Sequence, residues 1–235
     1  MIVEALFGEV CGLNGDGRNT DYLRQTLPDA TFRQTRLTEE PFFASGKPDI
    51  LYIGSMTEKT QRRVTEKLFP LRGRLQSLMD SGTVILATGN AGEIFATNIR
   101  YEPEDIKISG LGLLDFEVRV DLFRRYHGKV LGRFQEMEIV GFQCRFSKWY
   151  GKGNNAPFLQ VERGQGDAPG CPTEGFRVNN CFCTSLLGPI LPLNPLFTEY
   201  LIGLTGRRAT AAYQDEAMAA YTKRLSEFQN PKVRF

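Results

Sequence analysis

The side chains best suited to nucleophilic chemistry are few in this chain. It has a single histidine, His127, and five cysteines, which are Cys11, Cys144, Cys171, Cys181 and Cys183. A thiol paired with an imidazole can attack an amide carbon, because the imidazole takes up the thiol proton. The histidine is far from the cysteines in sequence, and Cys181-Phe182-Cys183 lacks the spacing of a structural zinc pair. We therefore expect no metal site, no cofactor and ordinary reduced thiols.

A second stretch has the pattern of a nucleophile mount. Thr83–Ala96 begins as an apolar, β-branched run, enters a turn of small residues and continues as the start of a helix. In many α/β enzymes such a turn carries a serine or cysteine nucleophile at its apex. Neither residue stands there in this chain. The neighbouring Thr88 is offset by one residue, so we expect its hydroxyl to point into the core.

Composition excludes several classes of partner. Charged residues make up 24% of the chain and the net charge is only +2, which gives no strong field for nucleic acid or an anionic membrane. No apolar run approaches the roughly 18 residues of a membrane span. No secretory signal is recognisable at the start. We therefore expect a cytoplasmic protein, organised as one domain over residues 1–235.

The elements that must position the turn at Thr83–Ala96 alternate along the first half. We expect strands over residues 2–7, 31–37, 49–55 and 83–88, and helices over 20–27 and 57–81. Pro70 should kink the second helical segment or begin a second helix within it. This alternation predicts a mostly parallel sheet flanked by helices, which is an α/β fold. The loop Gly12–Asn19 follows the first strand but contains neither nucleotide-binding glycine pattern, so we do not predict a phosphate site there.

The second half changes character. Apolar and polar residues alternate over residues 116–122 and 139–146, as in half-exposed antiparallel strands. Turns are expected at 151–155 and 164–167, a buried strand over 176–187, and helices over 196–204 and 213–228. The last helix has an apolar stripe, which we expect to pack on its own sheet, although it could dock a partner.

Six motifs follow one another in a fixed order along the chain. They are Asn14–Asn19, Leu51–Gly54, Ile85–Glu93, Glu138–Phe142, Thr173–Gly175 and Leu186–Pro195. In this order they resemble the class I glutamine amidotransferase domains of the cobyric acid synthase type, whose sheet is flavodoxin-like. The motifs are most similar to the glutaminase subunits of the lipid II isoglutaminyl synthase type. The resemblance covers nearly the whole chain.

The resemblance implies a defined chemistry. In that family a cysteine on the elbow after the fourth strand attacks the glutamine side-chain amide, and a histidine near the C-terminal end acts as its base. The ammonia passes to a partner, which implies a Mur-ligase-like or cobyrinic-acid-type synthetase subunit here.

When the family positions are carried over to this sequence, neither the nucleophile nor its base is present. The cysteine position falls on Gly89 and the catalytic histidine position on Leu187. A second family histidine position falls on Arg145, and the glycine-rich turn after the third strand begins at Gly54. Glycine adopts the strained backbone of an elbow at least cost, so the turn can persist without its nucleophile.

Three functional hypotheses follow. The first is a catalytically degenerate amidotransferase-like protein that acts as a binding or partner subunit, with a small-molecule ligand near Gly54, Ser55, Asn90 and Arg145. The charge of Arg145 would favour an anionic ligand. The second is an active amidotransferase or amide hydrolase whose nucleophile is Thr88, Cys144 or Cys183; we expect both cysteines on strands near the rim of the pocket. The third is a structural partner that uses the helix over residues 213–228.

Overall fold

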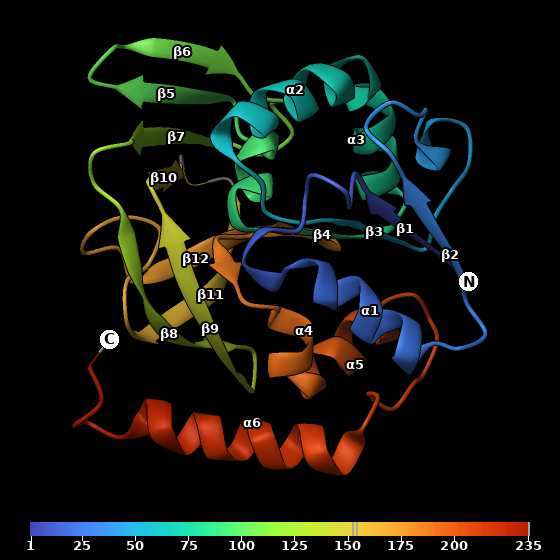
Figure 1. Ribbon diagram of the computed structural model, residues 1–235, viewed down its shortest axis with the longest axis vertical. Coiled ribbons are helices and arrows are strands. Elements are labelled where there is room, and N and C mark those ends of the chain that lie inside the picture. The colour runs from blue at the N-terminus through green and yellow to red at the C-terminus, as the bar shows by residue number, and fades with distance from the viewer. Residues whose placement is uncertain (152, 154, 235) are drawn as a thin grey trace.

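The computed structural model describes residues 1–151, 153 and 155–234. Its strands form a ten-stranded sheet, in the order β14-β9-β8-β11-β12-β13-β4-β3-β1-β2, and a four-stranded sheet, β10-β7-β5-β6. Figure 1 shows helices α2 and α3 above the larger sheet and α1, α4 and α5 below it, with the smaller sheet at the upper left. The predicted α/β class is confirmed.

The first half of the chain forms the parallel part of the large sheet. Its strands are β1 (Ile2–Leu6), β2 (Thr31–Thr35), β3 (Ile50–Ile53) and β4 (Val84–Thr88). All of their pairings are parallel, and β4 continues in parallel to β13 (Cys181–Thr184). The connecting helices are α1 (Gly17–Thr26), α2 (Glu58–Leu68) and α3 (Arg72–Asp80). The predicted strand–helix alternation is therefore present.

Pro70 divides the long helical segment as expected. It lies in a 3-10 turn, η3 (Phe69–Leu71), that separates α2 from α3, because proline removes a backbone donor from the helix interior. Thr57 caps α2, and its hydroxyl accepts from the backbone N–H of Thr60 at 3.2 Å. Both helices bury their apolar stripe, including Val64 and Leu75, in one core cluster on the large sheet.

The second half is mostly antiparallel; it extends the large sheet and forms the whole of the small one, in which only β5 and β7 pair in parallel. Its other strands are β5 (Asn98–Glu102), β6 (Ile106–Ser109), β7 (Phe116–Asp121), β8 (Tyr126–Phe134), β9 (Met137–Arg145), β10 (Ser147–Gly151), β11 (Ala156–Arg163), β12 (Thr173–Val178) and β14 (Leu186–Leu187). Beyond β13 every pairing in the large sheet is antiparallel. The antiparallel share is thus larger than the pattern of alternation predicted.

One strand prediction in this half is wrong. The single buried strand expected over residues 176–187 is instead β12, β13 and β14, because the chain reverses at Asn179, which has φ +52°. Asparagine tolerates this left-handed conformation better than most residues. Of the turn expected over 151–155, positions 152 and 154 lie outside the described residues.

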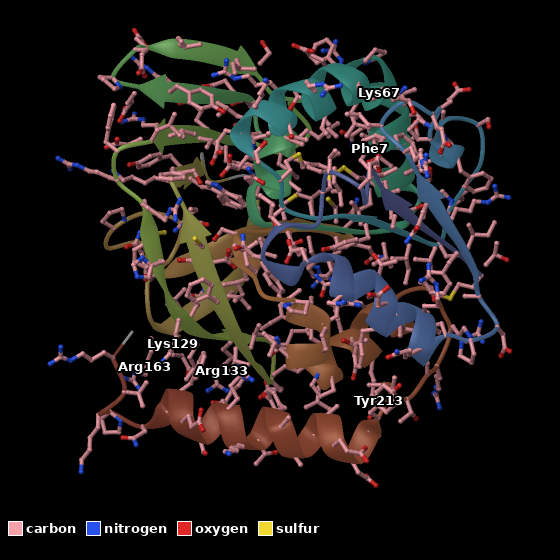
Figure 2. The ribbon with its side chains drawn as sticks, in the orientation of Figure 1. Phe7, Lys67, Lys129, Arg133, Arg163 and Tyr213 are labelled. Carbon is pink, nitrogen blue, oxygen red and sulfur yellow. The ribbon has the colours of Figure 1, made fainter. Side chains whose placement is uncertain are left out.

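The last helices are α4 (Ile190–Leu193), α5 (Pro195–Gly203) and α6 (Gln214–Gln229). Helix α6 buries Tyr221 and Phe228 against Leu131 and Val140 of β8 and β9, as the periodicity predicted. Tyr213 is the exception, since it caps α6 in a left-handed conformation and is 63% exposed; Figure 2 places it at the N-terminal end of the helix. The third hypothesis thereby loses its docking face.

No helix among the described residues is long and apolar enough to cross a membrane.

Candidate functional site

The turn after β4 keeps the form of an elbow but lacks a side chain at its apex. Gly89 has φ +60°, a backbone conformation that favours glycine. The chain continues as a 3-10 helix, η4 (Gly89–Phe95), rather than the expected α-helix. A β-carbon built on Gly89 would lie 2.6 Å from Cδ2 of Leu187 and 2.6 Å from Cβ of Ser55. The apex is therefore closed to a larger side chain by its two neighbours.

Leu187 reaches Gly89 from an edge strand of the large sheet. It lies on β14, which pairs with β9 so that Leu187 stands opposite Phe142. Its side chain is 2% exposed. The two positions that we assigned to the family nucleophile and base are therefore adjacent in the structure.

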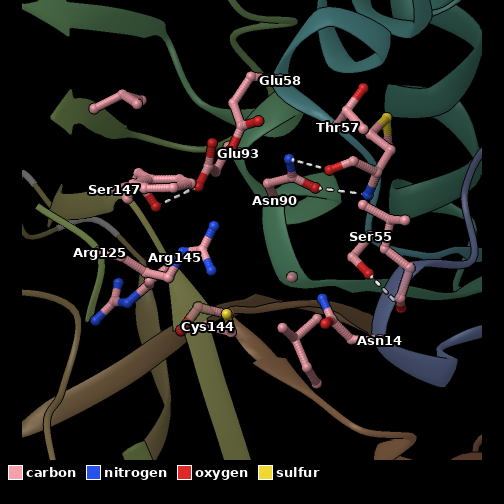
Figure 3. Close-up of a pocket in the computed structure, with 17 residues that line it drawn as sticks. Asn14, Ser55, Thr57, Glu58, Asn90, Glu93, Arg125, Cys144, Arg145 and Ser147 are labelled. Atoms are coloured by element: carbon pink, nitrogen blue, oxygen red, sulfur yellow. Dashed lines mark hydrogen bonds between the residues drawn. The ribbon is translucent and has the colours of Figure 1, made fainter. Parts of the chain in front are cut away.

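A cavity of about 290 Å³ opens above this contact. Figure 3 shows its lining side chains, most of which come from the loops after β1, β3 and β4 and from β9, β10 and β14. Of the predicted site residues, Ser55, Asn90 and Arg145 line it, together with Gly89 and Leu187. Gly54 does not line it; a β-carbon there would lie 2.6 Å from the backbone oxygen of Cys11. Glycine at 54 therefore serves close backbone packing.

Asn90 and Ser55 are committed to holding loops together. Asn90 accepts from the backbone N–H of Met56 at 2.9 Å and donates to the carbonyl of Met56 at 2.7 Å. The Ser55 hydroxyl donates to the carbonyl of Leu13 at 2.9 Å. These bonds, drawn in Figure 3, fix this wall of the cavity.

A buried polar network lies beneath the elbow, and the sequence analysis missed it. Asp16 accepts from the backbone N–H of Ser55 at 2.9 Å and from the hydroxyl of Thr88 at 2.8 Å. Thr88 also shares a hydrogen bond of 3.0 Å with the hydroxyl of Tyr52. Burial raises the pKa of Asp16. The hydroxyl of Thr88 therefore points into the core, as expected, and is not offered to the cavity.

Arg145 is buried, and its guanidinium forms hydrogen bonds that the sequence did not predict. Its guanidinium donates to the carbonyl oxygens of Asp167, at 2.9 Å, and Gly166. Burial lowers its pKa, while the nearby carboxylates of Asp167, Glu174 and Glu93 oppose that shift. Its Nε has no hydrogen-bond partner among the described residues. Its two terminal nitrogens are thus committed to the backbone, which weakens the expectation of an anionic ligand.

Glu93 is a second buried group that lines the cavity and that the sequence analysis did not select. It accepts from Ser147 Oγ, from Gln61 Nε2 at 2.8 Å and from Trp149 Nε1 at 3.3 Å. Burial raises its pKa. A charged residue inside the apolar run Ala91–Ala96 is the signal that could have identified it.

The two candidate cysteines differ in their access to the cavity. Cys144 lines it, and the β8–β9 register places His127 directly opposite Cys144 on the neighbouring strand. Cys183 is fully buried in β13 and does not line the cavity, so its expected place at the rim is wrong. Strand β13 is covered on both faces, and burial raises the pKa of the Cys183 thiol. All five cysteines are free.

The chain was then compared with known proteins. No protein-family model matches it. Over 154 residues it is 28% identical to "Lipid II isoglutaminyl synthase (glutamine-hydrolyzing) subunit GatD" of Staphylococcus aureus (strain N315). The match covers 66% of this chain and 62% of that relative's length.

Two solved structures of glutamine amidotransferases share the fold. One has a TM-score of 0.56 and 14% identity, and the match covers 88% of this chain and 100% of that one. The other, from Thermotoga maritima, has a TM-score of 0.56 and 10% identity, covering 97% and 92%. The chain therefore has a class I glutamine amidotransferase-like fold, as its motifs predicted.

Proposed function

We propose that this chain is a catalytically degenerate, cytoplasmic glutamine amidotransferase-like subunit that acts with a ligase or synthetase without hydrolysing glutamine. The likeness to an isoglutaminyl synthase subunit supports a Mur-ligase-like partner, and a cobyrinic-acid-type synthetase is the other candidate. The persistence of a cavity of about 290 Å³ supports a small-molecule ligand in contact with Ser55, Asn90 and Arg145.

The contact between Gly89 and Leu187 carries this proposal. Thiol-dependent amide hydrolysis needs a sulfur within hydrogen-bond reach of a base, and the base returns the proton to the departing ammonia. Here a glycine hydrogen and a leucine methyl occupy the two positions. Loss of either member of such a pair removes most of the rate, and loss of both leaves only binding effects.

The test is an assay of ammonia release from glutamine, with and without a Mur-ligase-like subunit. We expect no ammonia above a protein-free blank in either case. Turnover by the isolated chain would contradict the proposal.

One observation favours a second candidate, an amide hydrolase that uses Cys144. Cross-strand neighbours in an antiparallel pair project from the same face, with β-carbons about 4.5–5.5 Å apart, and His127 is the neighbour of Cys144. A glutamine-analogue diazoketone, with the adduct located by mass spectrometry, separates the candidates. The primary proposal predicts no adduct, whereas this candidate predicts one at Cys144 that Cys144→Ser abolishes.

A further inference from the structure

The four-stranded sheet carries a row of cations straight across its exposed face. The register places Lys148 opposite Arg119, Arg119 opposite Arg100, and Arg100 opposite Lys107. These side chains point outward, since the intervening residues of the strands, such as Val118, are buried in the core. The sheet lies at the upper left in Figure 1, away from α6. We refer to Lys148, Arg119, Arg100 and Lys107 as the basic row.

The basic row works against the stability of its own sheet. Like charges directly opposite each other on neighbouring strands are destabilising. Compensation is partial: Arg100 pairs with Asp105 at 2.5 Å, and the Arg119 guanidinium lies 4.8 Å from the ring centroid of Tyr150. Among the described residues, Lys107 and Lys148 form no ion pair. The charges of Lys107 and Lys148 are therefore available to an outside group.

An exposed aromatic side chain stands at the end of the same sheet. Phe123 follows β7 and is 80% exposed, beside Leu122 at 46%. Asp121 holds this turn, because its carboxylate accepts from the backbone N–H of Phe123 at 3.0 Å and its carbonyl accepts from that of Arg124 at 3.1 Å. Asp121 thus fixes the backbone that presents Leu122 and Phe123, two adjacent exposed apolar side chains that are available to a partner.

We propose that the basic row docks the acidic face of an α-helix from a partner protein, with Phe123 as an apolar anchor beside that helix. Adjacent strands lie about 4.8 Å apart, close to the helix pitch of about 5.4 Å. Acidic residues on successive helical turns therefore match successive members of the row. Same-face residues of an extended peptide repeat at about 6.7 Å, a spacing that does not match that of the basic row. Phe123 lies four residues after Arg119, in the turn beyond the end of β7, so it stands next to the basic row rather than within it.

The surroundings of the basic row favour a protein over nucleic acid. The rows on either side of it on the same face contain Glu117, Glu102 and Asp121. These carboxylates would repel a phosphate backbone, whose binding depends on many uncompensated cations. An acidic helix places its charges in one line instead. The inference rests on the proposed function only in that a partner subunit is needed to supply the helix.

The test uses a fluorescein-labelled, alanine-rich helical peptide of about 20 residues with glutamates at i, i+4, i+7 and i+11 and a leucine beside them. A second peptide has the same composition with its glutamates distributed around the helix. Fluorescence anisotropy measures binding to the full chain, to Arg119→Glu and to Phe123→Ser. Lys223→Glu, an exposed charge reversal on the distant helix α6, is the matched control.

We expect the patterned peptide to bind at least about fivefold more tightly than the distributed one, and Arg119→Glu to weaken it at least about tenfold. Phe123→Ser should weaken it about fivefold, and Lys223→Glu should change it less than about twofold. The inference would be overturned if the two peptides bound equally well or if neither bound. It would also be overturned if Arg119→Glu bound the patterned peptide as tightly as the unmodified chain does. Glutamine turnover would overturn the proposed function and leave this result unaffected.

Discussion

A β-carbon on Gly89 would lie 2.6 Å from Cδ2 of Leu187. Gly89 directly follows β4 and Leu187 lies on β14, nearly one hundred positions apart in sequence, and they stand where the related enzymes are expected to hold a nucleophile and its base. Glycine at position 89 and leucine at position 187 therefore alter one place in the structure and not two. A cysteine at position 89 would collide with Leu187, and a histidine at 187 would face no thiol.

Gly89→Ala should destabilise the protein by about 1–3 kcal/mol, because the methyl group meets Ser55 Cβ and the backbone has φ +60°. Urea denaturation measures the loss. Gly73→Ala is the matched control, since Gly73 lies in α3 with no atom within 4 Å of the new methyl group. The control should be neutral or stabilising by about 0.5–1 kcal/mol. Equal losses in the two variants would show that the elbow is not tightly packed.

Leu187→Ala should relieve part of the cost of Gly89→Ala. Alone it should cost about 2–5 kcal/mol, as the truncation of a buried leucine does. Because it removes the methyl that the new β-carbon would meet, the double variant should be more stable than the sum of the single losses by at least about 0.5 kcal/mol. A double-mutant cycle in urea measures this coupling. Strict additivity would mean that the residues do not touch.

The sequence predicted those features of the site that depend on neighbouring residues, and it failed for those that depend on segments far apart in the chain. Thr88 was assigned correctly because its direction follows from the alternation of side chains within one strand. Cys183 was misplaced because β13 is buried on both faces, so alternation does not identify the open side. The Cys144–His127 pairing depends on the register of the β8–β9 hairpin, whose turn at Gln135 contains no glycine to mark it. The buried cluster of Arg145, Glu93, Asp167 and Glu174 brings together two strands, a 3-10 helix and a loop that are distant in sequence, which no local pattern reveals.

Arg145→Gln should destabilise the protein by about 3–5 kcal/mol, because it leaves the buried carbonyl oxygens of Asp167 and Gly166 without their donor and removes the cation beside the buried Glu93 and Glu174. Arg125→Gln is the control, since Arg125 also lines the cavity but is exposed, and it should cost less than about 0.5 kcal/mol. Thermal denaturation of both variants at neutral pH decides the matter. A small loss for Arg145→Gln would indicate that its charge was placed for a ligand.

Asp167 should make stability fall as pH rises. Burial, followed by the proximity of Glu174, raises the pKa of its carboxyl to about 8 from an ordinary value of 3.8. The folded state thus holds this proton more tightly than the unfolded state. The resulting stabilisation is complete below pH 3.8 and declines as pH rises towards 8. Asp167→Asn should flatten the fall in melting temperature between pH 5 and pH 8.

The exposed Asp29 provides the control for this pH dependence. Its carboxylate is 83% exposed and its only ion pair among the described residues is with Arg207 at 3.4 Å. Asp29→Asn should leave the slope of melting temperature against pH unchanged. If Asp167→Asn also keeps the parental slope, the carboxyl of Asp167 does not hold its proton in the folded state.

The most direct test of the central claim is ammonia release from glutamine by the purified chain, in the presence and absence of a Mur-ligase-like subunit, with Cys144→Ser measured beside it. Because Gly89 and Leu187 offer neither thiol nor base, we predict no ammonia above the protein-free blank in any of these mixtures. Sustained ammonia release by the unmodified chain would contradict the account.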